Sequence, residues 1–147
     1  MITIPKCQRF KSSASVWDRI LRGWPIAGRL CQECMEDHGS QQYCTRNDVT
    51  RCKDYEPYCM NIVTVNTAGP NRVVTTVKTC ATESVCKSEW WEKSRLSDEC
   101  MSNRTEPPQG EDEIICNYCC QTADNASTAC NFLGIPPPTE RIVMERP

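Results

Sequence analysis

An alternating pattern near the middle of the chain gives the clearest structural signal. Residues 58–65 alternate with period two, the repeat with which a strand places successive side chains on opposite faces. Residues 72–80 contain the run 73–77, in which every residue is Val or Thr and therefore β-branched, a type enriched in strands. The sequence Asn-Thr-Ala-Gly-Pro-Asn at 66–71 lies between them and is typical of a turn. The pattern predicts a long β-hairpin over residues 58–80.

The pattern changes to shorter elements beyond this hairpin. Ser84 can cap a short helix that continues through residues 89–93. Residues 103–110 contain two prolines and predict a loop, and residues 113–118 return to strand character. The central part of the chain is therefore expected to be mainly β, with one short helix.

Residues 1–29 differ from the rest of the chain. Apolar residues recur at helical spacing between Val16 and Trp24, with arginines on the other face. One interpretation is a short amphipathic helix that binds a membrane or a partner protein. The other is a disordered leader outside the mature fold, which Gly23 and Pro25 favour because they end the pattern after about two turns.

The C-terminal residues differ in composition from both the leader and the central part of the chain. Residues 134–147 include the run Pro136 to Pro138, which favours extended geometry and predicts a stalk or tail. Residues 141–147 are not the apolar stretch of about 10–20 residues that a lipid-anchor signal needs. We therefore expect a basic leader at 1–29, a Cys-rich domain at 30–133 and a Pro-rich tail at 134–147.

Charge and hydrophobicity exclude several classes of protein. The net charge is −2 and the sequence pI is about 5.5, which is unlike a nucleic-acid-binding protein. No run approaches the roughly 20 apolar residues of a membrane-spanning helix. The N-terminus also lacks the apolar stretch of about 7–15 residues of a secretory signal.

Twelve of the thirteen cysteines lie between Cys31 and Cys130. This segment contains no Phe, a single Leu and few Ile, so its apolar core is thin for its length. Disulfides or a metal must supply the missing stability. A native disulfide in a small secreted domain typically contributes about 2–5 kcal/mol. Although no secretory signal is visible, the cysteine count favours an oxidising, extracellular compartment.

The spacing of the cysteines is the most specific signal in the chain. Cys31-x2-Cys34 opens the segment, the doublet at 119–120 comes near its end, and the Cys-Asn pair at 130–131 closes it. This frame resembles the three-finger LU-domain family, which includes lymphocyte antigen 6, the urokinase receptor and the snake α-neurotoxins. The resemblance implies a small, disulfide-rich, mainly β protein with a three-finger (snake toxin-like) fold, in which the third finger can carry a short helix.

The resemblance also implies which cysteines are joined. The six expected bridges are Cys31–Cys59, Cys34–Cys44, Cys52–Cys80, Cys86–Cys119, Cys100–Cys116 and Cys120–Cys130. The Cys100–Cys116 bridge is similar to the extra third-finger bridge of the branch that modulates acetylcholine receptors or Wnt signalling. The loop before Cys130 is longer than is usual in the family. Cys7 is left unpaired or belongs to a leader that is removed, and Asn131 matches the terminal Asn that hydrogen-bonds back to the core.

The same cysteines can also be interpreted as metal ligands. Cys31-x2-Cys34 and Cys116-x2-Cys119 each have the spacing of half a four-cysteine zinc site, and His38 lies nearby in the sequence. This alternative describes an intracellular zinc-binding module. It leaves the other cysteines unexplained, so we expect no metal and no cofactor.

Two sequons favour an extracellular location. Asn103-Arg104-Thr105 and Asn125-Ala126-Ser127 have the N-x-Ser/Thr pattern and fall in predicted loops. We therefore expect Asn103 and Asn125 to be glycosylated, although so short a motif also arises by chance.

The sequence contains no recognisable catalytic constellation. The single histidine, His38, lies in an acidic stretch, and no glycine-rich phosphate loop is present. Bridged cysteines cannot act as nucleophiles. We therefore expect a protein that is not an enzyme.

The finger tips are the expected binding surface, because a rigid scaffold presents its loops to partners. At the hairpin tip, Asn66, Asn71 and Arg72 are candidate contacts. Trp90 and Trp91 are further candidates, because adjacent residues on a helix cannot share one face and Trp is common at interfaces. An ordinary turn and packing against the disulfides explain the same residues equally well.

These expectations together describe an extracellular glycoprotein that is secreted or attached to the cell surface. Its expected partner is a cell-surface receptor or co-receptor protein, such as a nicotinic acetylcholine receptor or another ligand-gated ion channel, whose signalling it would modulate. No nucleic acid is expected to bind, and a membrane only through an anchor not visible in this chain. A structural or adhesive extracellular protein is the remaining alternative.

Overall fold

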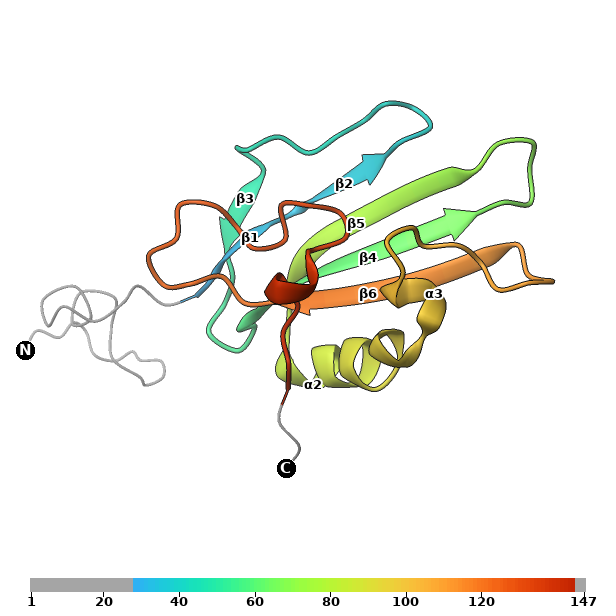
Figure 1. The fold of residues 1–147 in the computed structure, drawn as a ribbon. Helices are drawn as coiled ribbons and strands as arrows, with labels where there is room; N and C mark the ends of the chain where they lie inside the picture. The colour runs from blue at the N-terminus through green and yellow to red at the C-terminus, as the bar shows by residue number, and fades with distance from the viewer. Residues whose placement is uncertain (1–27, 145–147) are drawn as a thin grey trace, which may run out of the picture.

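The computed structural model describes residues 28–144, which form a small, mainly β protein with six disulfides (Figure 1). The leader helix considered above and Cys7 lie outside the described residues. Two antiparallel sheets are present. The smaller pairs β1 (Leu30–Gln32) with β3 (Val49–Arg51). The larger has the order β2 (Cys34–Asp37), β5 (Val73–Ala81), β4 (Tyr58–Asn66), β6 (Glu113–Cys120).

The predicted hairpin is present and forms the centre of the larger sheet. Strands β4 and β5 pair from Tyr58 opposite Ala81 to Asn66 opposite Val73. Strand β6 lies along the other edge of β4, and β2 along the other edge of β5. The predicted strand at 113–118 is also present, and it continues to Cys120.

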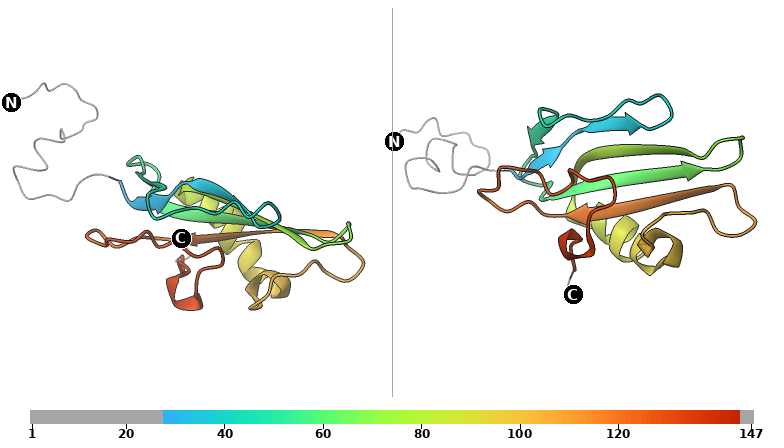
Figure 2. Two further views of the ribbon diagram at one scale, coloured as in Figure 1. Left: turned by 90° about the horizontal axis from the view of Figure 1, so that it is seen from above. Right: turned by 45° about the horizontal axis from the view of Figure 1, so that its top comes forward.

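A chain of short helical turns connects β5 to β6. It consists of α2 (Glu83–Val85), the π-helical turn η1 (Cys86–Trp91), the 3-10 turn η2 (Ser94–Leu96) and α3 (Asp98–Met101). Thr82, not Ser84 as predicted, caps the first turn by accepting a hydrogen bond from the backbone N–H of Val85. Seen from above, this helical segment and the C-terminal segment lie on one side of the larger sheet (Figure 2).

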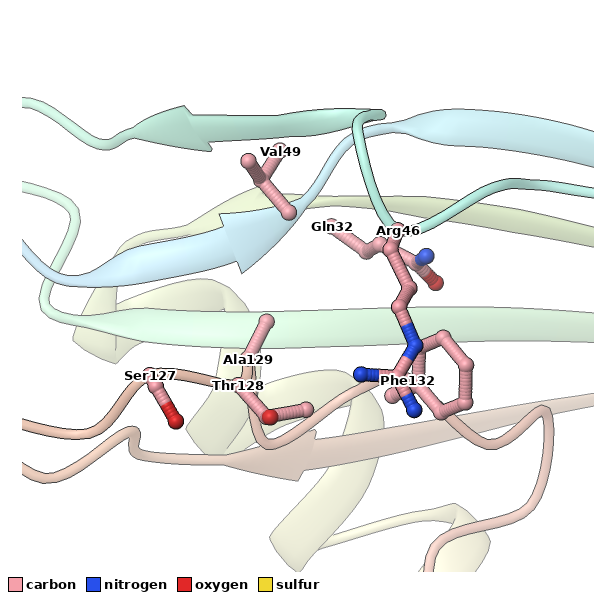
Figure 3. A pocket seen from close by; sticks show the side chains of 7 residues that line it. All are labelled: Gln32, Arg46, Val49, Ser127, Thr128, Ala129 and Phe132. Carbon is pink, nitrogen blue, oxygen red and sulfur yellow. The ribbon is translucent and has the colours of Figure 1, made fainter.

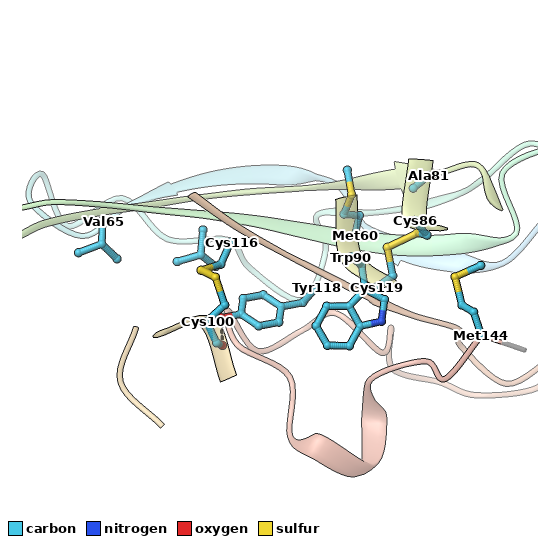
Figure 4. Close-up of a cluster of buried hydrophobic side chains, with 11 residues drawn as sticks. Met60, Val65, Ala81, Cys86, Trp90, Cys100, Cys116, Tyr118, Cys119 and Met144 are labelled. Atoms are coloured by element: carbon cyan, nitrogen blue, oxygen red, sulfur yellow. Dashed lines mark hydrogen bonds between the residues drawn. A yellow bond between two sulfur atoms is a disulfide. The ribbon is translucent and has the colours of Figure 1, made fainter. Parts of the chain in front are cut away.

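The main core lies between the sheet and these two segments (Figure 4). Trp90 is 2% exposed and its ring lies 5.8 Å from that of the fully buried Tyr118. Burial raises the pKa of Tyr118, so its phenol stays protonated and donates to the carbonyl of Cys100 at 2.6 Å. Two disulfides, Cys86–Cys119 and Cys100–Cys116, belong to the same cluster.

A second cluster consists almost entirely of cysteines. Cys31, Cys52, Cys59 and Cys120 are buried in it, with Cys80 and Cys130 packed against them. The bridges are Cys31–Cys59, Cys34–Cys44, Cys52–Cys80, Cys86–Cys119, Cys100–Cys116 and Cys120–Cys130, the same six pairs that the cysteine frame implies. Disulfides therefore replace large apolar side chains where the strands converge.

The C-terminal segment differs from the stalk expected from its prolines. Pro136 and Met144 are buried, and the backbone N–H of Ile142 donates to the carbonyl of Cys119 at 2.8 Å. The indole N–H of Trp90 donates to the carbonyl of Ile142, also at 2.8 Å. Residues 134–144 thus cover the core and belong to the folded domain. Among residues 28–144, no helix has the length and apolar character needed to cross a membrane.

Candidate functional site: a groove beside the central hairpin

A buried polar network fixes the C-terminal segment to the sheet. The side-chain oxygen of Asn131 accepts from the backbone N–H of Gln32 at 2.8 Å. Its amide donates to the carbonyl of Gln32 and to the side-chain oxygen of Asn61, both at 3.1 Å. Asn61 in turn donates to the carbonyls of Leu133 and Gly134 at 2.6 and 3.1 Å. Asn131 therefore makes the kind of hydrogen bonds to the core that the resemblance implies.

Lys78 is the charged member of this network. Its side chain is 1% exposed, and its ammonium donates to the side-chain oxygen of Gln32 at 2.8 Å and to the carbonyl of Phe132. Burial lowers the pKa of Lys78, and the Glu36 carboxylate, 3.6 Å away, opposes part of this shift. Lys78 lies directly opposite Asn61 in the hairpin and shares its face, but neither the alternation at 58–65 nor the β-branched run at 73–77 marked this position.

A groove opens on the same face of the sheet, next to this network. Its volume is about 450 Å³, within the range of about 300–1,000 Å³ that is typical of ligand sites. Val63, Val65 and Val74 of the hairpin form part of an apolar lining. Residues 133–135 and residues 103–105 also line the groove. The site therefore combines segments that are far apart in the sequence.

Arginines and a histidine give the groove a basic rim. His38, Arg72 and Arg104 are among the lining residues. Glu106 lies close to both guanidinium groups, with its carboxylate 3.3 Å from Nε of Arg72. One carboxylate therefore faces two permanent cations, so the rim keeps an excess of positive charge.

Hydrogen bonds join the hairpin tip to the loop that precedes β6 and to the first residue of that strand. Arg72 donates from Nη2 to the carbonyl of Thr105 at 2.8 Å. Asn66 donates to the Glu113 carboxylate at 3.4 Å, and the backbone N–H of Thr67 donates to the carbonyl of Asp112 at 2.7 Å. Of the three predicted tip contacts, Arg72 lines the groove, whereas Asn66 and the exposed Asn71 lie outside its lining. Arg72 is therefore also a structural residue.

The two adjacent tryptophans have different environments. The π-helical turn places Trp90 in the core, where 2% of it is exposed, so its prediction as a partner contact is wrong. Trp91 is half-buried, and the guanidinium of Arg95 lies 3.6 Å above its ring. Trp91 does not line the groove.

A smaller hollow lies between β1, β3 and the C-terminal loop (Figure 3). Arg46 extends toward Phe132 there, with its guanidinium carbon 5.8 Å from the ring centre. The volume of about 50 Å³ suits a few water molecules but not an organic ligand. The larger groove is the better candidate for a binding site.

The cysteines proposed as zinc ligands, Cys31, Cys34, Cys116 and Cys119, are all held in disulfides. Two groups of three sulfurs lie within 4.8 Å of one another, at Cys31, Cys52 and Cys80 and at Cys59, Cys120 and Cys130. All six belong to bridges, and a bridged sulfur is not the thiolate that zinc requires. His38 is exposed and lies 3.7 Å from the Glu36 carboxylate.

The two sequons differ in the exposure of their hydroxyl residues. Asn103 is exposed and lines the groove, but Thr105 is 1% exposed and its hydroxyl lies 3.1 Å from that of Tyr118. Asn125 and Ser127 are both exposed. The N-x-Ser/Thr pattern predicts both sites, but it does not reveal that Thr105 is buried and Ser127 exposed.

Comparisons with protein-family models, with curated proteins and with solved structures give no match. The likeness to the LU-domain family therefore stays a prediction based on the cysteine frame. The six disulfides fit an extracellular protein.

Proposed function

We propose that this chain is an extracellular three-finger module of the LU-domain type that binds a cell-surface receptor or co-receptor protein and modulates its signalling. The groove beside the β4–β5 hairpin is the observation that carries this proposal. Disulfides brace the segments around it, and a preorganised site loses less entropy on binding. The cysteine frame and the terminal Asn131 support the family assignment.

The lining suggests the chemistry of the partner. Valines suit an apolar side chain of the partner, and the arginine rim suits a nearby carboxylate. We therefore infer that the partner presents an apolar residue beside an acidic one. The extracellular domain of a ligand-gated channel, such as a nicotinic acetylcholine receptor, and that of a signalling co-receptor are the two classes to test.

The substitution Val74→Thr tests the groove without changing its shape. Burial of a hydroxyl without a partner costs about 1–3 kcal/mol, so affinity should fall between about 5-fold and about 150-fold. Val77→Thr is the matched control, because Val77 lies on the same strand with its side chain on the opposite face. Surface plasmon resonance against candidate receptor domains measures the effect. Equal affinity of Val74→Thr and the parent protein would contradict the groove as the receptor site.

The opposite face of the sheet favours adhesion as a second candidate function. Met35 and Ile115 are 54% and 53% exposed there, and Val77 lies directly opposite Met35. A contiguous exposed apolar patch often marks a protein contact. If this face mediates self-association, Val77→Thr should weaken it in sedimentation experiments while Val74→Thr leaves it unchanged.

A further inference from the structure

The sequon at Asn103 lies where a glycan would affect the groove. Asn103 is exposed and lines the groove. The neighbouring Thr105 carbonyl accepts from Arg72, which fixes this loop to the hairpin. A bulky sugar chain on Asn103 would therefore extend from a point held beside the groove.

The folded protein hides the group that makes Asn103 an acceptor. The N-x-Ser/Thr requirement means that the glycosylating enzyme reads the hydroxyl as well as the asparagine. Thr105 is 1% exposed, and because the Tyr118 phenol donates to Cys100, the Thr105 hydroxyl donates to Tyr118. An enzyme cannot reach this hydroxyl without opening the core.

A disulfide closes the segment that contains this sequon. Cys100 and Cys116 are 16 residues apart in sequence and bracket Asn103. Both cysteines are buried in the core cluster with Tyr118. The bridge and the buried Thr105 hydroxyl therefore share Tyr118 as a neighbour in the core.

We propose that Asn103 is glycosylated only before the Cys100–Cys116 segment closes, and that the attached glycan covers the groove. The protein then exists in a covered and an open form, whose ratio depends on how fast this segment closes. In the reaction, the Asn103 amide nitrogen bonds to C1 of an oligosaccharide, a lipid pyrophosphate leaves, and a base takes the amide proton. The inference rests on the proposed function, because it gives that site a means of regulation.

The second sequon provides an internal control. Both Asn125 and Ser127 are exposed, so the folded protein leaves this acceptor accessible. Asn125 does not line the groove, and a glycan there should not cover it. The two sites should therefore differ in when they are modified and in what the modification does.

The timing is tested by site occupancy in secretory cells. The full chain, directed to the secretory pathway, is compared with Cys100→Ser/Cys116→Ser and with Cys34→Ser/Cys44→Ser as control. Occupancy of Asn103, measured by mass spectrometry of peptides, should at least double in the first variant and stay unchanged in the second. Occupancy of Asn125 should not change in either. This readout does not need a native fold, and equal Asn103 occupancy in all three proteins would overturn the proposed timing.

The covering effect is tested with 8-anilinonaphthalene-1-sulfonate, an apolar dye with an anionic group that suits the groove. Asn103→Gln should bind the dye several-fold more tightly than the protein glycosylated at Asn103, whereas Asn125→Gln should not. Adding Val74→Thr to Asn103→Gln should remove the gain. Equal dye binding with and without the Asn103 glycan would overturn the covering effect. A failure of the receptor proposal alone would leave these dye results unchanged and would appear only in the receptor assay.

Discussion

At the residue scale, Lys78 shows how a charged side chain can be accommodated in a small domain. Its stem lies in the interior, and its ammonium reaches a carbonyl, an amide oxygen and the carboxylate of Glu36. Removal of one partner would leave a buried charge unpaired, which is strongly destabilising. The lysine thus links β2, β5 and the C-terminal segment.

The lowered pKa of Lys78 predicts a pH dependence of stability. Because the pKa of Lys78 in the folded protein lies below its ordinary value of 10.5, the unfolded chain binds more protons as the pH approaches 10.5. The contribution of Lys78 to stability should therefore rise through this window, and Lys78→Met should lack that contribution. Urea unfolding between about pH 8 and about pH 10 measures it.

The comparison needs a lysine without this environment. Lys53 is exposed, so Lys53→Met should keep the pH dependence of the parent protein. Free thiols should be alkylated beforehand to prevent disulfide exchange. A Lys78→Met protein with the same pH profile as Lys53→Met would contradict a shifted pKa at Lys78.

At the element scale, the C-terminal segment is the main departure from the sequence expectation. Three consecutive prolines predict extended backbone, and the backbone does stay extended at Pro137. What local sequence could not reveal is that the segment covers Trp90, which precedes it by about fifty residues, through the carbonyl of Ile142. Local sequence also could not reveal which of Trp90 and Trp91 is buried, because the π-helical turn decides which of them faces inward.

Truncation tests whether this segment belongs to the fold. A chain that ends at Gly134 loses the buried Met144 and Pro136, and full burial of one large apolar side chain stabilises by about 1.5–3 kcal/mol. The free energy of unfolding should therefore fall by at least about 2 kcal/mol, and tryptophan emission should shift to longer wavelength. A chain that ends at Met144 keeps all these contacts and serves as control. If the two chains were equally stable, residues 135–144 would contribute nothing to the core.

At the whole-molecule scale, the cysteines made most of the fold predictable. The resemblance of their frame to the LU-domain family implied six bridges, and the alternation along residues 58–65 with the β-branched run at 73–77 placed the central hairpin. Neither pattern predicts the groove, because residues that line it, such as Val65, Leu133 and Thr105, meet only after the chain is folded. Candidate contacts chosen from exposed turns therefore included Arg72 of the groove but missed its valines.

The disulfide count predicts the covalent state of the oxidised protein. Six bridges remove twelve hydrogens relative to the reduced chain. Alkylation under denaturing conditions without reductant should then modify Cys7 alone, and after reduction all thirteen cysteines. Mass spectrometry distinguishes these products. Extensive alkylation without reductant, together with bound zinc, would support the intracellular zinc module instead.

Arg72 belongs both to the hairpin tip and to the lining of the groove. Its guanidinium holds the carbonyl of Thr105 and the carboxylate of Glu106, so a partner that draws Arg72 away at the tip must release both groups beside the groove. If such a partner bound at the tip, its binding would change affinity in the groove, and thermodynamic linkage would make the effect equal in both directions. Two ligands on this protein would thus be coupled through one side chain, and Arg72→Ala would uncouple them.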